Sequence, residues 1–186
     1  MMALTKTPVC DFGKKAEDFK LKSIKNKMIT LNDIKGKKAT LVMFICNHCP
    51  YVRAIIKNLA SDCNDLKKEG INSVAIMSND TKNYTEDSFE NMIKFAEVNN
   101  FNEIDYLFDE TQEIAKKYGA VCTPDFFGYN KNLQLQYRGR FRELKDLKPT
   151  NNGESDLKKA MKMVAQTQRG PVNQIPSMGC NIKWFK

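Results

Sequence analysis

The sequence ATLVMFI at residues 39–45 is almost entirely apolar and runs directly into CNHCP at residues 46–50. A strand that helices cover on both faces has this composition. After Pro50, apolar residues recur at helical spacing as far as Cys63, and Gly70 can end a helix there. The stretch therefore predicts a buried central strand, a turn with two cysteines, and a helix.

The alternation of strand and helix continues along the rest of the chain. Residues 18–24 and 28–31 are expected to form an N-terminal hairpin, followed by a short capped turn at 32–36. The periodicity then predicts strands over 71–78, 106–108, 126–129 and 133–137, and helices over 87–99, 111–118 and 155–166. Residues 139–154 form a polar excursion. This order predicts an α/β sandwich with a central mixed sheet.

One domain is expected over residues 1–168, with residues 169–186 as an extended C-terminal tail that packs on it. The length of 186 residues and the 41% hydrophobic content suit one compact unit. The tail holds Pro171, Pro176 and two glycines. No apolar run approaches the length of a membrane helix or an export signal, so we expect a cytoplasmic location and no membrane partner.

The net charge of +8 points to no partner. An acidic middle segment, residues 62–113, separates two basic ones, and the lysines are scattered among strand-like and turn-like stretches. A nucleic-acid binder places its basic residues and aromatics together on one surface. We therefore expect a solvated lysine-rich surface and no nucleic-acid partner.

The two cysteines at the strand–helix junction carry the strongest chemical signal. Cys46 and Cys49, placed on the first helical turn, would share a face and could close a small disulfide ring. Helix N–H groups would favour a thiolate at Cys46, and His48 between the two could add a cation or a hydrogen bond. Thiols in such settings have pKa values lowered to about 3.5–7.5. The pattern predicts redox thiol chemistry.

Metal and haem sites fit the pattern less well. Structural zinc usually requires two cysteine pairs, or one pair with two histidines, and this chain has one histidine inside its one pair. A c-type haem requires histidine after the second cysteine, where Pro50 stands. No metal and no cofactor is therefore predicted, although a metal held by Cys46, Cys49 and His48 remains a third alternative.

Five motifs follow one another along the chain: DFKL at 18–21, FICNHCPYV at 44–52, CTPDFF at 122–127, YRGR at 137–140 and MGCNIKW at 178–184. With these motifs, from about residue 15 to its end, the chain resembles the thioredoxin-fold redoxins, most closely the peroxiredoxin-like proteins of the alkyl hydroperoxide reductase/thiol-specific antioxidant type. The resemblance implies a thioredoxin-like three-layer sandwich with an N-terminal β-hairpin extension. It also implies a role in cell redox homeostasis.

The resemblance also implies roles for individual residues. Cys46 would be the exposed attacking thiol and Cys49 the buried resolving thiol. Pro124 would be a cis-proline facing the disulfide, and the backbone of Thr123 would hold a substrate chain. Typical thioredoxins have a buried aspartate where this chain has Thr40, so His48 or Asp125 would have to accept the proton of the second cysteine.

The predicted activity is thiol–disulfide oxidoreduction by Cys46 and Cys49 on protein or small-molecule disulfides. An external thiol system, thioredoxin or glutathione, would restore the reduced pair. The alternative is a thiol peroxidase. Peroxide would oxidise Cys46, and either Cys49 or Cys180 would then resolve the oxidised sulfur. Peroxiredoxins attack peroxide from the position of Cys49, preceded by a Pro-x-x-x-Thr-x-x motif that this chain lacks.

Four cysteines lie outside the motif. Cys63 falls on the apolar helix face and is expected in the core, and Cys10 in a mobile N-terminal segment is assigned no role. Cys122 is either a packed strand-end residue or a neighbour of the active sulfurs. Cys180 is either part of a tail anchor with Ile182 and Trp184 or a third redox thiol. Arg138 and Arg140 are expected at a solvated hairpin end, with anion binding as the alternative.

Overall fold

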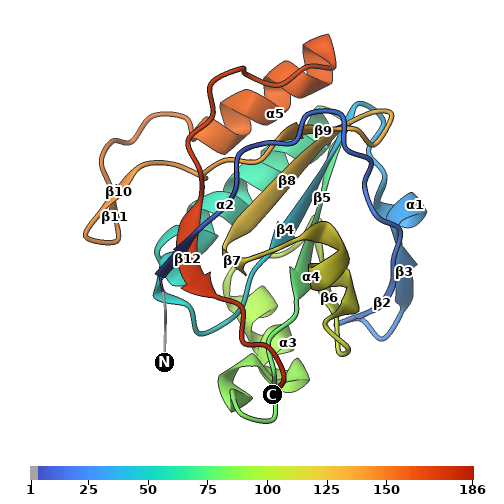
Figure 1. The fold of residues 1–186 in the computed structure, drawn as a ribbon, viewed down its shortest axis with the longest axis vertical. Helices are drawn as coiled ribbons and strands as arrows, with labels where there is room; N and C mark the ends of the chain where they lie inside the picture. Colours follow the sequence, from blue (N-terminus) through green and yellow to red (C-terminus); the bar gives the residue numbers. More distant parts are fainter. Residues whose placement is uncertain (1–3) are drawn as a thin grey trace.

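A seven-stranded mixed sheet forms the centre of the computed structural model, which describes residues 4–186 (Figure 1). The central strand β4 pairs in parallel with β5, and β5 with β6, whereas every other pairing in this sheet is antiparallel. In spatial order, the strands are β3 (Met28–Thr30), β2 (Lys20–Ser23), β6 (Ile104–Phe108), β5 (Ile71–Met77), β4 (Ala39–Phe44), β8 (Asp125–Asn130) and β9 (Leu135–Tyr137).

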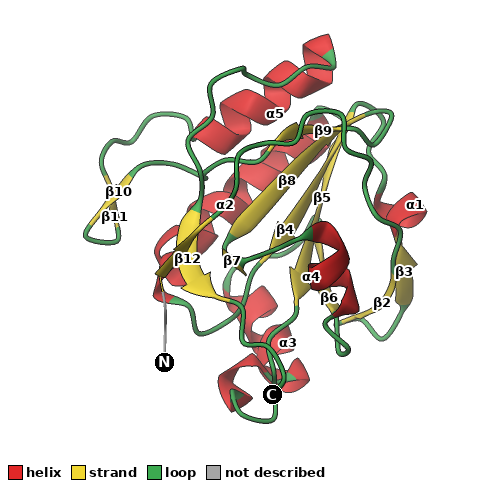
Figure 2. Ribbon diagram, in the orientation of Figure 1, coloured by secondary structure: helices red, strands yellow, loops and turns green. Residues whose placement is uncertain are grey.

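Helices cover both faces of this sheet, as the apolar composition of β4 predicted (Figure 2). All six residues of β4 are buried. One core lies between the sheet and α2 (Pro50–Lys68), α3 (Phe89–Val98) and α5 (Asp156–Thr167). The other lies under α1 (Leu31–Ile34) and α4 (Glu113–Tyr118). The three layers confirm the predicted α/β sandwich.

Local sequence explains where most helices begin and end. Ser88 and Ser155 accept hydrogen bonds from backbone N–H groups as N-caps of α3 and α5. Thr30 and Asp33 form a capping box on α1. Gly119 ends α4 at φ 66°, a conformation that glycine adopts without strain. A 3₁₀ helix at Thr85–Asp87 precedes α3.

A second, three-stranded sheet joins the two ends of the chain. The strand β12 (Met178–Asn181) pairs antiparallel with both β1 (Leu4–Lys6) and β7 (Cys122–Thr123). The middle of the tail, which was predicted to be extended, is a strand hydrogen-bonded on both sides. The sequence missed this pairing since β1 and β7 are only three and two residues long.

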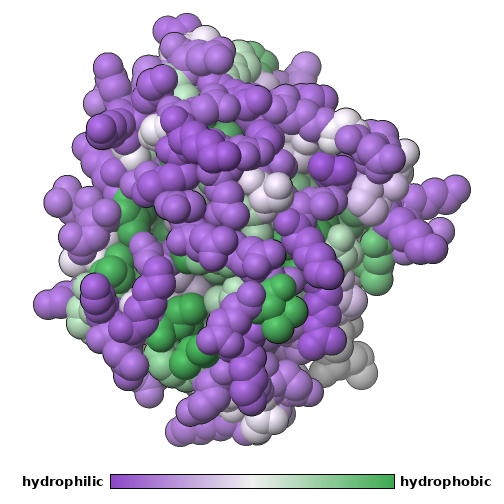
Figure 3. Space-filling model, turned by 180° about the vertical axis from the view of Figure 1, so that it is seen from behind, coloured by the Kyte–Doolittle hydropathy of each residue, from purple (hydrophilic) through white to green (hydrophobic). Residues whose placement is uncertain are grey.

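The polar excursion at 139–154 also contains regular structure. Strands β10 (Leu144–Lys145) and β11 (Lys148–Pro149) form a small hairpin that extends from the body of the fold (Figure 1). Residues 1–3 of the N-terminal stretch considered for an export signal lie outside the described residues. Within residues 4–186, no helix combines the length and apolar composition required to cross a bilayer. The rear face is mainly hydrophilic, with apolar side chains in small separate areas (Figure 3).

Candidate active site

The cysteine loop lies between the end of β4 and the start of α2. Helix α2 begins at Pro50, so Cys49 is its N-cap, and Cys46 lies three residues before Cys49, outside the helix. The prediction that both cysteines occupy the first helical turn is therefore wrong. Proline fits the first helical position because its missing N–H would have no partner there. The helix terminus consequently favours negative charge at Cys49 rather than at Cys46.

Cys46 is buried, with 1% of its surface exposed, so the expectation of an exposed thiol is wrong. Its sulfur lies 3.3 Å from Thr123 Oγ1. It also lies within 4.8 Å of ligand atoms of His48 and Asp87. Burial, the hydrogen bond with Cys49 and the Asp87 carboxylate raise the pKa of Cys46 well above its ordinary value. Cys46 is therefore held as a protonated thiol.

Cys49 is also fully buried, yet its surroundings favour the thiolate. The Cys46 thiol and the backbone N–H groups of Cys180 and Val52 donate toward its sulfur, and the Cys180 sulfur, 3.1 Å away, also lowers its pKa. The Cys46 hydrogen bond is the largest of the causes that lower the pKa of Cys49 to about 5, against the effect of burial. The Thr123 carbonyl oxygen, 3.1 Å away, opposes this shift because it accepts only from a protonated thiol. The groups that lower the pKa of Cys49 outweigh this acceptor and the effect of burial, so the balance lies with the thiolate.

Cys180 approaches Cys49 from the C-terminal strand. The two sulfur atoms are 3.1 Å apart although the residues are 131 positions apart in sequence. Burial and the contact with Cys49 raise the pKa of Cys180 to about 12. Ile182, two residues on, is buried, whereas Trp184 is 37% exposed with the Lys116 ammonium 5.8 Å from its ring centre. The tail thus packs on the domain and also places a third thiol at the pair.

His48 points into a polar network centred on Asp87. Its Nδ1 lies 2.7 Å from Asp87 Oδ2, and its ring stacks on that of Tyr84. The Asp87 hydrogen bond raises the pKa of His48, against the effect of burial. Its Nε2 is buried and finds no hydrogen-bond partner among residues 4–186. The histidine is therefore tied to a carboxylate, with its second nitrogen left for a further contact.

Asp87 is the functional residue that the sequence did not reveal. It is fully buried, and it accepts hydrogen bonds from the backbone N–H groups of Asn47 and His48 and from Asn79 Nδ2. Tyr106 supports the same loop by donating to Asn47 Oδ1. Asp87 lies 38 positions beyond the motif, at a predicted helix start, where an acidic residue is ordinary. Nothing in the local pattern connects it with the cysteines.

A metal ion would have to compete with these hydrogen bonds. Cys46, His48 and Asp87 form a group of possible ligands whose donor atoms lie within 4.8 Å of one another. This set differs from the sequence alternative, because Asp87 takes the place of Cys49. The Asp87 oxygens already accept from three N–H groups and contact His48 Nδ1. The Asp87 oxygens are thus occupied by hydrogen bonds, whereas His48 Nε2 has no partner among residues 4–186.

Thr123 lies directly against both cysteines, and the one cis peptide bond in residues 4–186 joins it to Pro124. The resemblance implied this cis-proline. It also implied that the Thr123 backbone is available to a substrate chain, but Cys180 of β12 pairs with Thr123. Cys122 is buried, and its sulfur lies 3.6 Å from the Pro124 carbonyl oxygen. Burial is the main cause that raises the pKa of Cys122, so it is packed as an unreactive thiol.

Asp125 is engaged elsewhere and does not reach the cysteines through any described hydrogen bond. It is fully buried and forms an ion pair with Arg138, whose Nη2 lies 3.0 Å from its Oδ2. The Arg138 guanidinium also stacks on Phe127. The prediction that Arg138 lies at a solvated hairpin end is wrong, since it is only 8% exposed. Arg140 pairs with Asp156 at 2.7 Å on the surface.

The remaining cysteines lie away from the pair. Cys63 is buried on α2 as expected, and burial raises its pKa to about 12. Cys10 is partly buried, packs against the core under α4, and hydrogen-bonds Gln174. The expectation of a mobile segment there is not supported, because Thr7 and Gly13 make backbone hydrogen bonds to Ser177 and Leu135.

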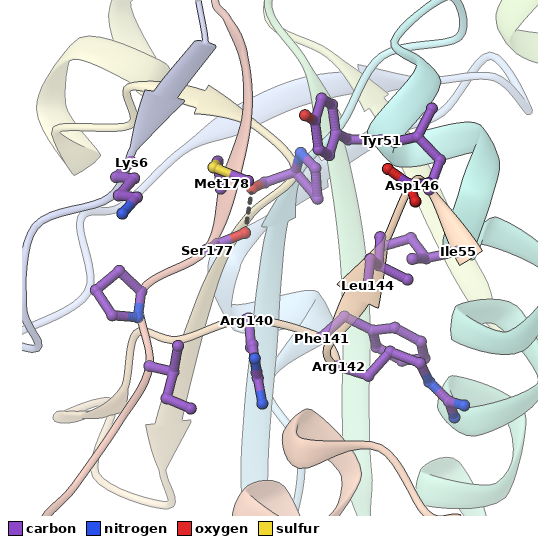
Figure 4. Close-up of a pocket in the computed structure, with 14 residues that line it drawn as sticks. Lys6, Tyr51, Ile55, Arg140, Phe141, Arg142, Leu144, Asp146, Ser177 and Met178 are labelled. Atoms are coloured by element: carbon purple, nitrogen blue, oxygen red, sulfur yellow. Dashed lines mark hydrogen bonds between the residues drawn. The ribbon is translucent and has the colours of Figure 1, made fainter. Parts of the chain in front are cut away.

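A cavity of about 400 Å³ adjoins the site without containing its sulfur atoms (Figure 4). Tyr51, two positions after Cys49, and Pro124, next to Thr123, are among its lining residues. Ser177 of the tail, which also lines the cavity, donates to the Pro124 carbonyl oxygen at 2.8 Å. Charged residues of both signs line it, among them Arg140, Arg142 and Asp146, while Phe141, Leu144 and Ile175 contribute the apolar part. The cavity can therefore receive a group that is partly apolar and partly polar.

Solved structures of two similar bacterial proteins cover nearly the whole chain. An uncharacterized conserved protein from Geobacillus kaustophilus is 39% identical, with a TM-score of 0.89 over 100% of this chain and 98% of that one. A hypothetical protein from Sinorhizobium meliloti is 37% identical, with a TM-score of 0.86 over 97% of this chain and 98% of that one. None of the curated proteins matches the sequence.

More distant structures share the fold alone. The thioredoxin domain of a thiol-disulfide oxidoreductase from Bacteroides vulgatus is 18% identical, with a TM-score of 0.58 over 71% of this chain and 89% of that one. It shows that the three-layer sandwich described above is thioredoxin-like. The AhpC/TSA family model matches residues 12–141, which include the cysteine loop, the cis-proline and Asp87. The chain therefore belongs to the AhpC/TSA family of thioredoxin-fold redoxins, whose chemistry is that of thiol-based oxidoreductases.

Proposed function

We propose that the protein is a thiol–disulfide oxidoreductase whose redox couple is Cys46 and Cys49. The observation that carries this proposal is the unequal pair of buried sulfurs: one thiol donates a hydrogen bond to the other, which collects further donors at a helix N-terminus. Such an arrangement supplies a nucleophilic thiolate and, beside it, the thiol that resolves the mixed disulfide.

The charge distribution assigns the thiolate to Cys49. Its sulfur would attack one sulfur of a substrate disulfide, and the other substrate sulfur would leave as a thiolate. The Cys46 sulfur would then attack Cys49, close the Cys46–Cys49 disulfide and release the second substrate thiolate, which takes the Cys46 proton. The substrate gains two electrons and the protein loses them. Thioredoxin or glutathione would restore the reduced pair.

His48 and Asp87 act here as positioning residues. Asp87 accepts from the backbone N–H groups of Asn47 and His48, and so fixes the loop that carries both cysteines. Its negative charge also raises the pKa of Cys46 and keeps the proton on that sulfur. Thr123 lies in contact with both sulfurs, and Pro124, which lines the adjoining cavity, is proposed as the surface against which the substrate disulfide lies.

Mixed-disulfide trapping tests this assignment. Both variants are made with Cys180→Ser, so that Cys180 cannot release the trapped partner. We expect Cys46→Ser/Cys180→Ser to accumulate a mixed disulfide with an aromatic disulfide probe, and Cys49→Ser/Cys180→Ser to capture none. The opposite result would return the attacking role to Cys46, as the family resemblance implied. Capture by neither variant would contradict the oxidoreductase proposal.

A second candidate function is peroxide reduction, which family membership and the position of Cys49 favour. A peroxide would transfer one oxygen to the Cys49 thiolate, giving a sulfenic acid and an alcohol or water. A neighbouring thiol would then form a disulfide with Cys49 and release water. Stopped-flow reaction of the reduced protein with hydrogen peroxide tests it. A rate no faster than that of a free thiol with the same pKa would discard this candidate.

A further inference from the structure

Strand β12 lies where an incoming chain would have to pair with the edge of β7. Its Cys180 is opposite Thr123, the residue before the cis-proline, and its backbone N–H and its thiol both point to Cys49. Gly179 allows this approach, since a Cβ there would lie 2.0 Å from the Thr123 carbonyl oxygen. The chain thus presents its own cysteine to its own reactive sulfur.

The strand is held in this position from both ends. On its N-terminal side, Ser177 exchanges hydrogen bonds with Thr7 and donates to Pro124. On its C-terminal side, the Lys183 N–H donates to Asn79, whose Nδ2 donates in turn to Asp87. The anchors therefore fix Cys180 against the cysteine loop and connect the strand with the network that holds the loop.

We propose that Cys180 is a third redox cysteine, which takes over the disulfide from the Cys46–Cys49 pair by forming a disulfide with Cys49. The proposal rests on the proposed function of that pair. It is carried by the 3.1 Å separation of the Cys49 and Cys180 sulfurs, which must approach by only about 1 Å to reach the S–S bond length of about 2.05 Å.

The exchange balances without any further reagent. The Cys180 sulfur attacks Cys49, the Cys49–Cys180 bond forms, and the Cys46–Cys49 bond breaks. Cys46 leaves as a thiolate and takes up the proton that Cys180 has lost. The number of disulfides and the number of protons are unchanged. In the reduced protein, burial and the neighbouring Cys49 sulfur hold the pKa of Cys180 high; oxidation of Cys49 removes the second of these causes and so lowers the pKa of the attacking thiol.

Trypsin separates the two disulfides. Cys46 and Cys49 lie together in the peptide 39–53, whereas Cys180 lies in the peptide 170–183. A Cys46–Cys49 disulfide is therefore internal to one peptide, and a Cys49–Cys180 disulfide joins two. The full-length protein is equilibrated in a series of glutathione redox buffers, quenched with acid, alkylated, digested and analysed by mass spectrometry.

We expect the wild type to give both the internal disulfide and the joined peptides. In Cys46→Ser, the joined peptides should be the main intramolecular disulfide, which assigns the bond to Cys49. In Cys180→Ser, they should disappear while the internal disulfide increases. Cys122→Ser is the matched control, since Cys122 neighbours Thr123 and its partner Asn181 neighbours Cys180, and it should behave as the wild type.

Two negative results have different meanings. If peptide 39–53 forms its internal disulfide and no joined peptides appear in the wild type or in Cys46→Ser, Cys180 is only a structural anchor and this inference is overturned. If neither disulfide forms at any buffer composition, the proposed function fails as well. Joined peptides that persist in Cys49→Ser and vanish in Cys46→Ser would place the bond on Cys46 and contradict the proposal.

Discussion

Cys46 and Cys49 are three residues apart, and both are buried. Even so, the charges around the two sulfur atoms are opposite in sign. Burial, the hydrogen bond with Cys49 and the Asp87 carboxylate keep the proton of Cys46 in place. Cys49 faces a helix N-terminus, two thiols and two backbone N–H groups, which stabilise its negative charge. The comparison shows that the spacing of a cysteine pair does not decide which sulfur is the thiolate. The groups that each sulfur faces decide it, and two of the residues that supply them, Asp87 and Cys180, come from distant parts of the chain.

The largest expected effect is the loss of the thiolate in Cys49→Ser. In the wild type, ultraviolet thiolate absorbance should titrate with a midpoint near the pKa of about 5. Cys49→Ser should remove this transition. Cys46→Ala should keep it and move its midpoint upward, because Cys49 loses its main hydrogen-bond donor. A low-pH transition that persists in Cys49→Ser and disappears in Cys46→Ala would reverse the comparison.

The same shift has a consequence for stability. A thiol whose pKa is lowered on folding contributes stability that is complete above its ordinary pKa of 9.0 and is lost as pH falls toward 5. Relative to Cys49→Ser, the free energy of unfolding of the wild type should therefore rise with pH between about 5 and 9. Urea unfolding of both proteins at several pH values, with reductant present, measures it. Parallel pH curves would contradict the assignment.

Asp87→Asn should have the next largest effect, because it removes the charge on the Cys46 side. Removing one partner from a buried ionic network costs about 3–5 kcal/mol, and urea unfolding measures this. The pKa of His48 should fall, and the signal is easily assigned by NMR because the chain has one histidine. The pKa of Cys46 should fall as well. An unchanged His48 titration would show that Asp87 does not control this side of the pair.

Gly179→Ala tests the Cys49 side. The added Cβ would lie 2.0 Å from the Thr123 carbonyl oxygen, so β12 must shift away from β7. We expect a loss of about 1–3 kcal/mol in the free energy of unfolding, as in other overpacked sites, and faster alkylation of Cys49. Gly153→Ala is the matched control, since its Cβ would meet only an exposed side chain. If Cys49 is alkylated at the wild-type rate in both variants, β12 does not cover the cysteine pair.

The smallest expected effect concerns His48→Asn, which keeps a hydrogen-bond donor near Asp87 but removes the ionisable ring. The pKa of His48 is raised on folding, so its contribution is complete below the ordinary value of 6.5 and is lost as pH rises through the folded-state pKa. The stability difference between wild type and variant, about 1 kcal/mol for a hydrogen bond of this kind, should shrink with increasing pH. Urea unfolding on either side of neutrality measures it, and a difference that grows would contradict the His48–Asp87 link.

Much of the fold could be predicted from local patterns. The apolar run before Cys46 predicted β4, and helical periodicity predicted α2, because burial on one or two faces leaves a regular trace in sequence. The short strands β1, β7 and β12 could not be predicted in this way. They are two to four residues long. β7 lies more than fifty positions from its partner β12, and β1 lies more than a hundred positions from β12.

The sequence by itself determined which residues could carry the chemistry: Cys46, His48 and Cys49 between a buried strand and a helix, with Thr123 and Pro124 later in the chain. The tertiary structure decided how their charges are distributed. Asp87 comes from the segment before α3 and Cys180 from the C-terminal strand, and each lies against one member of the pair. A pKa depends on groups within a few ångströms of the titrating atom, and only the folded chain brings these groups together.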